Sequence, residues 1–362
     1  MTRHTPHCQS PPKLPRPPRE GVFKYLRARD ARIQKDSAVL ARFPLSRLLT
    51  LGLLILAATA LIAAACSDDD DDSASQAQSD QTVGSTADAA FPFTFTDSAD
   101  VEVTLQAPAR RIVSYSPGAT EILFAIGAGD QVIAADEFSD FPAATKALER
   151  VAYSDPDPER ALTLDPDFLI MTSRQVEQAP QFRRAGLNVA LLLEPESLDG
   201  VIENIRLLGR VTGNVDQANA LADDMRTRID AVIATISGSD DAAPVVLYEL
   251  TNDLYTAGPD TFIGGMLTLL GARNVAQGAT SPFPQLTAEA VIDADPNVVL
   301  LTDAEFGESF ETVAARPGWS GVSAVVDQRV FPLDPDLVNR PGPRIVDGFE
   351  TMAALLYPDL FE

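Results

Sequence analysis

Two stretches of the sequence carry the same pattern: PERALTLDPDFLIMT at residues 158–172 and AEAVIDADPNVVLLT at residues 288–302. In each, Glu159 or Glu289 precedes an Asp-Pro pair by six residues, and an apolar run follows. Proline disfavours a helical residue before it, so the pattern predicts a short helix that ends at Asp-Pro and leads into a buried strand. The repeat favours two similar α/β lobes, and a coincidental match is the alternative.

The surrounding sequence alternates short apolar strands with helices. Such near-continuously apolar strands are typical of a parallel sheet covered on both faces, so we predict an α/β fold with two Rossmann-like lobes. A hairpin is expected at 91–105. Strands are expected at 111–115, 131–135, 168–172, 188–193, 245–250, 297–302 and 329–333, and helices at 119–126, 158–164, 261–270 and 344–356.

Residues 198–236 have a different pattern. Ile202, Ile205, Leu208 and Val211 recur at helical spacing, and Gly213-Asn214 interrupts the run. The pattern predicts one or two long helices in the middle of the chain. The body is therefore expected to divide into a lobe at 91–198, a linking helix at 199–237 and a lobe at 238–362.

The segment 48–66 is an uncharged apolar run that follows Arg42 and Arg47 and ends in three alanines and Cys66. This order is typical of a secretory signal. It resembles a lipoprotein signal, in which Cys66 would be lipidated and become the mature N-terminus. The alternative is an uncleaved membrane anchor, because 18 apolar residues just suffice to span a bilayer. Both interpretations place the body outside the cytoplasm, attached to the membrane.

Two polar segments flank this signal. Residues 1–47 begin with a proline-rich extension that no signal needs, so the true start is expected nearer Val39. If the extension is real, it is a disordered cytoplasmic segment. Residues 67–90 have almost no apolar bulk and predict a flexible acidic linker. Its run Asp68–Asp72 lacks the alternating ligand spacing of a calcium loop.

Charge and composition exclude several functions. The 362-residue chain has a formal net charge of −24, with 11 Lys/Arg and 3 Asp/Glu before Cys66 and 17 Lys/Arg and 49 Asp/Glu in the rest. Such an acidic body repels the phosphates of nucleic acids. From Ser67 onward there is no Cys and no His. This excludes disulfides, Cys/His nucleophiles, Ser-His-Asp triads and Cys/His zinc sites in the body.

Several ordered blocks of the body resemble the iron-siderophore and vitamin B12 binding proteins of ABC importers. The blocks begin with RRIVSYSPGATEILFAIGAGDQVIAADEFSDFP (110–142), and the later ones are PERALTLDPDFLIM, YTAGPDTFIGGMLTLLGARNVA, FPQLTAEAVIDADPNVVLLT and RPGWSGVSAVVDQRVFPLDPDLVNRPGPRIVDGF. The resemblance covers residues 91–362. It implies the class III periplasmic-binding-protein fold: two lobes, one long interdomain helix, a ligand cleft between the lobes and little lobe closure.

The resemblance also gives the repeated glutamates a role. In this family each lobe presents a surface glutamate to the transporter, and the matching positions are Glu159 and Glu289. A two-fold symmetric permease would need the same charge from both lobes, and charge-complementary docking sets orientation and association rate. The alternative is that each glutamate only favours the start of its helix through the helix dipole.

Ligands of α/β lobes bind beyond the carboxyl ends of the strands. The candidate residues in those loops are Tyr115, Ser116, Pro117, Phe138, Arg174, Tyr255, Arg340 and Arg344. The aromatic rings suit a large ligand with an apolar face, and the arginines suit peripheral amides or carboxylates. As alternatives, the tyrosines are core residues and one arginine only fixes its loop. Trp319 is expected to be structural.

The ligand itself is the least determined point. The lack of histidine excludes His-ligated haem and disfavours bare zinc or manganese, whereas Tyr-ligated haem, ferric siderophores and cobalamin remain. The Glu-bearing helices and FSDFP resemble the cobalamin proteins slightly better. Thr172 and Leu337 depart from that pattern, since the best-known cobalamin binder has tryptophans there. We expect no resident cofactor or metal, because the metal arrives with the transported chelate.

The resemblance therefore predicts a monomeric, non-catalytic binding lipoprotein that partners an ABC permease and ATPase. An enzyme with paired carboxylates is a rival, but nothing selects one pair among the 49 acidic residues of the body. A lipid-anchored sensor that reports its ligand to a receptor is the second rival.

Overall fold

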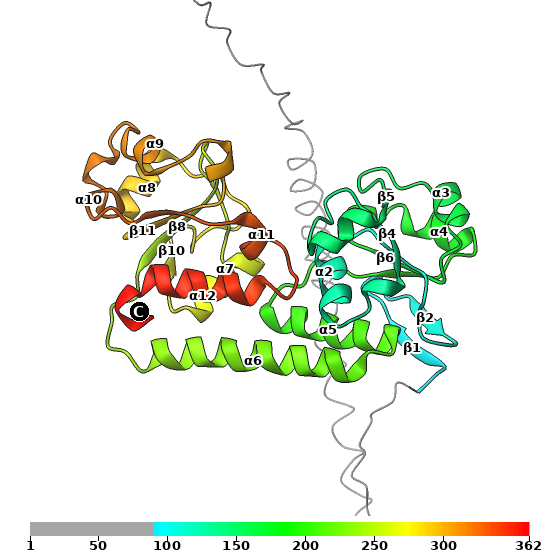
Figure 1. The fold of residues 1–362 in the computed structure, drawn as a ribbon. Helices are drawn as coiled ribbons and strands as arrows, with labels where there is room; N and C mark the ends of the chain where they lie inside the picture. The colour runs from blue at the N-terminus through cyan, green and yellow to red at the C-terminus, as the bar shows by residue number, and fades with distance from the viewer. Residues whose placement is uncertain (1–89, 362) are drawn as a thin grey trace, which may run out of the picture. The chain divides into compact units, whose positions relative to one another are not determined.

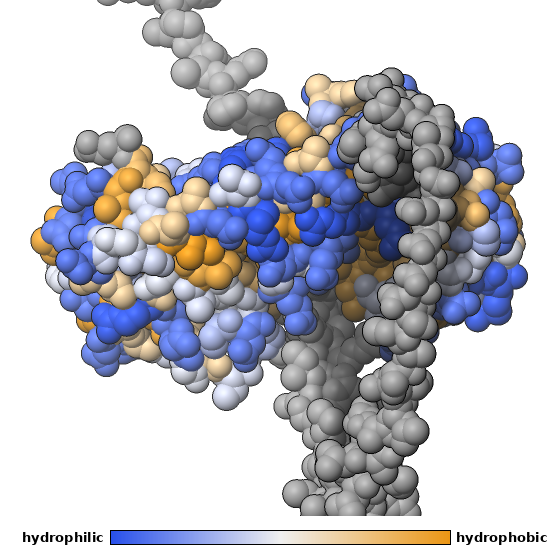
Figure 2. Space-filling model, turned by 90° about the horizontal axis from the view of Figure 1, so that it is seen from below, coloured by the Kyte–Doolittle hydropathy of each residue, from blue (hydrophilic) through white to orange (hydrophobic). Residues whose placement is uncertain are grey.

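The computed structural model describes residues 90–361, and Ser85–Glu362 forms one compact unit. The predicted signal, Cys66 and the linker as far as residue 89 lie outside the described residues. Within residues 90–361, no helix combines the length and the apolar character that crossing a membrane requires. The face that carries the long helix α6 (Val215–Ser237) is largely hydrophilic, as the acidic composition of the body leads one to expect (Figure 2).

The first lobe begins with the predicted hairpin and continues as a parallel sheet. Strands β1 (Phe93–Thr96) and β2 (Glu102–Leu105) pair antiparallel. The sheet has the strand order β5-β4-β3-β6-β7. Its strands are β3 (Ile112–Ser114), β4 (Val132–Asp136), β5 (Glu149–Val151), β6 (Phe168–Met171) and β7 (Val189–Leu191), and its helices are α2 (Pro117–Ala125), α3 (Pro158–Thr163) and α4 (Ala179–Arg184). Short 3-10 turns occupy Gly129–Gln131, Ala143–Ala147 and Ser173–Gln175.

Two consecutive helices link the lobes, α5 (Leu198–Thr212) and α6 (Figure 1). The Ser197 hydroxyl accepts a hydrogen bond from the Gly200 N–H and caps the start of α5. Gly213 ends α5 with a φ of 78°, a left-handed conformation that glycine adopts without the steric penalty of a side chain. The predicted break at Gly213 is therefore present, and two helices rather than one form the linker.

The second lobe contains another parallel sheet, of order β10-β8-β11-β12, with a short strand β9 antiparallel to β8. Its strands are β8 (Val245–Thr251), β9 (Tyr255–Thr256), β10 (Arg273–Asn274), β11 (Val298–Leu301) and β12 (Val330–Pro332). Its helices are α7 (Phe262–Leu269), α8 (Ala288–Ala294), α9 (Phe310–Ala314), α10 (Ser323–Val326), α11 (Pro335–Val338) and α12 (Ile345–Leu356), with 3-10 turns η5 (Ala304–Phe306), η6 (Trp319–Gly321) and η7 (Pro358–Leu360). The α/β prediction with two parallel sheets is confirmed.

The two repeated stretches have the same backbone conformation at the point where helix gives way to strand. Asp165 follows α3 with a φ of 49°, and Asp295 follows α8 with a φ of 45°. Aspartate tolerates this left-handed conformation better than most side chains. The predicted role of Asp-Pro as the end of each helix is therefore present in both lobes, and in each case it acts through an aspartate with positive φ.

The residue after each proline also has the same contact in both lobes. An Asp167 side-chain oxygen accepts a hydrogen bond from the Arg111 backbone N–H at 3.0 Å. An Asn297 side-chain oxygen accepts one from the Val245 backbone N–H at 2.9 Å. These bonds satisfy a backbone donor at the start of the neighbouring strand, so the repeated sequence encodes a repeated strand start.

One apolar cluster runs through both lobes. It joins residues of α2 and β3 to residues of α5, α6, α7, β8 and α12. Two smaller clusters fill the other face of each sheet, and Trp319 is buried in the one that belongs to the second lobe. The structural role predicted for Trp319 is thus confirmed. The lobes therefore share a continuous core at the linking helices.

Candidate functional site

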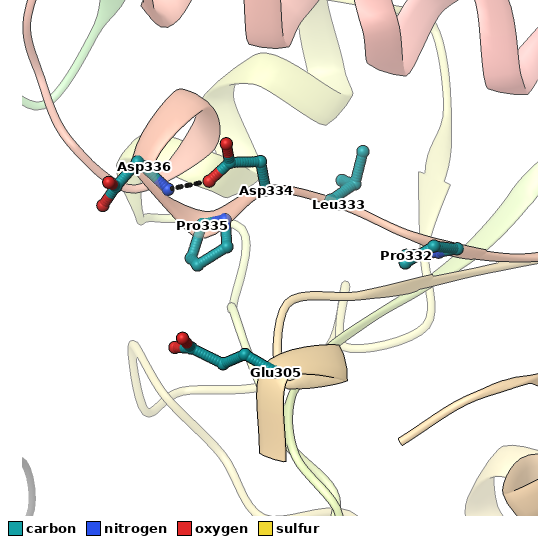
Figure 3. Close-up of a pocket in the computed structure, with 6 residues that line it drawn as sticks. All are labelled: Glu305, Pro332, Leu333, Asp334, Pro335 and Asp336. Carbon is teal, nitrogen blue, oxygen red and sulfur yellow. Dashed lines mark hydrogen bonds between the residues drawn. The ribbon is translucent and has the colours of Figure 1, made fainter. Parts of the chain in front are cut away.

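A pocket of about 500 Å³ lies where strands β11 and β12 end in the second lobe (Figure 3). This position matches the general location of ligand sites in α/β sheets, and the volume is typical of a small-molecule pocket. Turn η5 forms one wall, and the segment from β12 into α11 forms the other. The lining residues are Glu305, Pro332, Leu333, Asp334, Pro335 and Asp336.

Three of the six lining residues are acidic. In Figure 3 the Glu305 carboxylate lies on one wall, and Asp334 and Asp336 lie on the other. An Asp334 carboxylate oxygen accepts a hydrogen bond from the Asp336 N–H at 2.9 Å and caps α11. Acidic walls attract hydrogen-bond donors and cations and repel carboxylates. Asp336 is already paired with Arg340 at 2.8 Å, so Glu305 and Asp334 are the carboxylates that favour a ligand with N–H groups or positive charge on this side.

The second lobe also contains a buried ionic cluster at the end of β8. Glu249, at the end of β8, is fully buried and receives two hydrogen bonds of 2.6 Å from the Arg316 guanidinium. Arg316 also donates to Glu308 at 2.7 Å. Burial raises the pKa of the Glu249 carboxyl, and the hydrogen bonds from Arg316 oppose that shift. The bidentate pair fixes the carboxyl end of β8.

Asp303 lies beside this cluster, directly before the pocket wall η5. It is 3% exposed, and neither carboxylate oxygen has a hydrogen-bond partner among the residues the structure describes. Burial, and next the nearby Glu249 carboxylate, raise the pKa of Asp303 to about 7. Its charge therefore changes near neutral pH, close to the pocket.

In the first lobe, the segment after β3 holds three of the predicted ligand residues. Tyr115 is 1% exposed, and its ring packs edge-on against Phe182 with the ring centres 6.0 Å apart. Ser116 caps α2 by accepting a hydrogen bond from the Ala119 N–H, and Pro117 is the first residue of α2. Tyr115 thus has the core position that was the alternative to a cleft position, whereas Ser116 and Pro117 remain partly accessible.

The other predicted residues of the loops differ in exposure. Phe138 is 53% exposed and contacts Tyr153 edge-on at a ring-centre distance of 5.4 Å. Arg174, in the turn after β6, and Tyr255, in β9, are partly exposed. Phe138 is therefore the predicted aromatic residue that offers most of its ring to a ligand.

Both predicted arginines contact the opposite lobe. Arg344 donates to Glu121 of α2 from Nε at 3.0 Å and from Nη2 at 2.6 Å. Arg340 donates to Glu121 at 3.1 Å, to Asp140 at 2.8 Å and to Asp336 at 2.8 Å. The alternative that an arginine fixes its loop therefore describes both side chains in this structure.

Sequence reasoning missed Glu121 and the acidic wall of the pocket. Glu121 lies inside an apolar helix, where an acidic residue is almost never buried without a partner. That buried position was the available signal, but its partners are more than 200 residues away along the chain. Asp334 and Asp336 belong to the last of the segments that resemble the family. Their Asp-Pro-Asp sequence is typical of a turn, so it did not indicate that they line a pocket.

The repeated glutamates are exposed on both lobes. Glu159 lies in the first turn of α3 and Glu289 in the first turn of α8. Both side chains are exposed, and neither forms an ion pair within residues 90–361. Two equivalent helix starts thus present one unpaired carboxylate each.

The described residues include no cluster of three or more His, Cys, Asp or Glu side chains suited to a metal ion.

Comparisons with known proteins agree with this geometry. The family model described as periplasmic binding protein matches residues 112–337. An ABC transporter substrate-binding lipoprotein of Bacillus subtilis, YvrC, is 32% identical over 75% of this chain and 88% of its own length. A cobalamin-binding protein of Halobacterium salinarum is 32% identical over 73% of each chain. The structure of the periplasmic heme-binding protein RhuT of Roseiflexus sp. RS-1 is 28% identical and covers 70% of this chain and 100% of its own, with a TM-score of 0.61.

Proposed function

The chain belongs to the periplasmic binding protein family of ABC transporter substrate-binding proteins, and from this premise we propose that it captures cobalamin and delivers it to a permease. Members of this family are non-catalytic proteins that work outside the cytoplasm with a permease and a small ligand. The predicted class III fold, ABC-importer family and non-enzymatic role are confirmed. The choice of cobalamin and the lipid anchor at Cys66 are our proposals.

The observation that carries the choice of ligand is the acidic wall formed by Glu305, Asp334 and Asp336. Cobalamin bears several peripheral amides, whose N–H groups donate hydrogen bonds to carboxylates. Its cobalt is already enclosed by the corrin and its axial ligands, so the pocket need not supply a ligand to the metal. The cobalamin-binding relative from Halobacterium is consistent with this choice.

Haem fits the same residues less well. Its propionates are carboxylates, which the acidic wall would repel. Its iron would need a protein ligand, and the body has no histidine. Tyr115 and Tyr248 are buried, which raises their pKa values, so a partly exposed tyrosine such as Tyr255 would have to serve. Haem remains the alternative because RhuT has the same fold. A ferric siderophore carries its own iron ligands and is the other alternative.

Docking is proposed to use Glu159 and Glu289. They occupy the same position in equivalent helices, and both carboxylates are exposed. Exposed charges of this kind set orientation and association rate when the partner presents basic pockets. The helix-dipole role is compatible with docking, because both positions lie in a first helical turn.

Uptake by reconstituted vesicles tests the proposed function. The permease and ATPase are placed in liposomes, and the chain is added outside with radiolabelled cyanocobalamin and internal ATP. We expect ATP-dependent accumulation only when the chain is present. A sensor for a receptor would bind cyanocobalamin without supporting uptake, and a chain that transports only haemin would overturn the choice of ligand.

A further inference from the structure

Glu121 is a buried acid whose hydrogen-bonding partners come from the other lobe. Its side chain is 2% exposed within the apolar helix α2. Arg344 binds both of its oxygens, and Arg340 binds one of them. A bidentate arginine–carboxylate pair is among the stronger and more directional contacts in proteins. The first lobe thus carries the anion and the second lobe the cations of one buried contact.

The backbones of the two lobes also touch at this place. A Cβ atom added to Gly118 would lie 2.8 Å from the carbonyl oxygen of Pro341, and one added to Gly342 would lie 3.1 Å from Glu121 Oε2. A recess of about 20 Å³, room for about one water molecule, lies beside Ser116 and Pro341. Figure 1 shows the loop between α11 and α12 extending toward α2. Glycine at both positions permits this close approach.

Two further contacts anchor the arginines. Arg340 also binds Asp140 of the first lobe and Asp336 of its own lobe. The Arg344 guanidinium lies 4.0 Å from the ring centre of Phe141, in cation–π contact with the first lobe. Each arginine therefore has at least two partners, and its charge stays compensated while the lobes are in contact.

We propose that Glu121, Arg340 and Arg344 form an interlobe latch that holds the lobes at one separation and so limits the size of a ligand that contacts both the pocket of the second lobe and the first lobe. The limit on ligand size rests on the proposed function, whereas the fixed separation does not. Without the latch, the shared core at α5 and α6 would be the main connection, and the carboxyl ends of the two sheets could move apart. Glu121 then acts as a positioning residue that does not touch the ligand.

Distances between spin labels test the latch in the full chain without ligand. Cys8 and Cys66 are replaced by Ser, and labels are attached at Gln181→Cys in the first lobe and Val326→Cys in the second, both exposed positions. We expect one narrow distance distribution for the parent protein. Glu121→Gln should broaden it or shift it, because the neutral Gln side chain cannot replace the carboxylate that pairs with Arg344 and Arg340 across the lobes.

Gly118→Ala supplies a second variant that removes no charge. Its added methyl group should push the Pro341 carbonyl away and shift the distribution by itself. Gly278→Ala is the matched control, because nothing lies within 4 Å of the added carbon there. Unchanged distributions in folded Glu121→Gln and Gly118→Ala would overturn the latch. If Glu121→Gln does not fold, the comparison of the distance distributions of Gly118→Ala and Gly278→Ala tests the latch.

Ligand size provides the second readout. Dissociation constants for cyanocobalamin and for cobinamide, which lacks the nucleotide loop, are compared in the parent protein and Gly118→Ala. A latch that sets the cleft width should change the ratio of the two constants by about tenfold or more. The spin-label distances test whether the latch fixes the separation of the lobes, and that test does not depend on which chelate is the ligand.

Discussion

At the scale of single residues, the contacts of a charged side chain are harder to predict from sequence than the position of the loop that carries it. Arg340 and Arg344 were expected beside a ligand because their loop follows a strand. In the structure both bind Glu121, a partner 219 and 223 positions away in sequence. A local sequence pattern cannot predict an ion pair between residues so far apart in the chain. A single acidic residue within an apolar helix does indicate that a partner exists.

The buried Asp303 predicts a dependence of stability on pH. Its pKa is raised to about 7, so the folded state holds its proton more tightly than the unfolded state does. The contribution of Asp303 to the free energy of unfolding is therefore complete below about pH 4 and is lost as the pH rises through about 7. Asp303→Asn, which imitates the protonated form, should raise the melting temperature by roughly 3–6 °C at pH 8 and by much less at pH 5.

Thermal unfolding followed by circular dichroism at both pH values measures this difference. Asp327→Asn, an exposed acid in the same lobe, is the control and should be close to neutral at each pH. An equal effect of Asp303→Asn at pH 5 and pH 8 would show that the proton on Asp303 is not responsible.

The exposure of Phe138 in the first lobe leads to a prediction about the affinity for cyanocobalamin. Its ring is 53% exposed and free to cover the apolar face of a corrin. Phe138→Ala should weaken cyanocobalamin binding about tenfold, the effect of losing about 1.4 kcal/mol of contact. Leu269→Ala, an exposed apolar residue on α7, is the control for titration calorimetry and should bind as the parent does. Equal affinities for both variants would remove Phe138 from the site.

Single elements were predicted well where their pattern is strong. The hairpin, the long helices α5 and α6 and the strands β3, β4, β6, β7, β8, β11 and β12 follow from apolar periodicity and glycine breaks. Strand β5, helix α4 and the short helices α9–α11 were missed. They are three to six residues long, and their order comes from packing against the sheets more than from local sequence.

The repeated helices predict the behaviour of the transporter complex. Glu159→Arg together with Glu289→Arg should leave cyanocobalamin binding intact and abolish stimulation of the transporter ATPase, because each exposed carboxylate would become a repelled cation. Glu102→Arg with Glu203→Arg changes the net charge equally at two other exposed positions and serves as control. ATPase rates in proteoliposomes measure the effect. Full stimulation by the Glu159/Glu289 variant would exclude the pair from docking.

At the scale of the whole molecule, the repeat at 158–172 and 288–302 determined the architecture. Two lobes with equivalent helix-to-strand corners place two sheets with their carboxyl ends available to a ligand. Composition excluded metal sites that depend on histidine or cysteine, because the body contains neither residue. The identity of the pocket wall could not be predicted, because it depends on how η5 and α11 face each other in three dimensions.

The central claim is that the acidic pocket of this ABC substrate-binding protein holds a corrinoid. The most direct test mixes residues 67–362 with cyanocobalamin, ferric siderophores or haemin in separate samples and passes each over a sizing column. The visible absorbance of the ligand shows whether it travels with the protein. We predict that cyanocobalamin elutes with the protein and that haemin does not. Haemin or a siderophore eluting with the protein, with cyanocobalamin left behind, would contradict the claim.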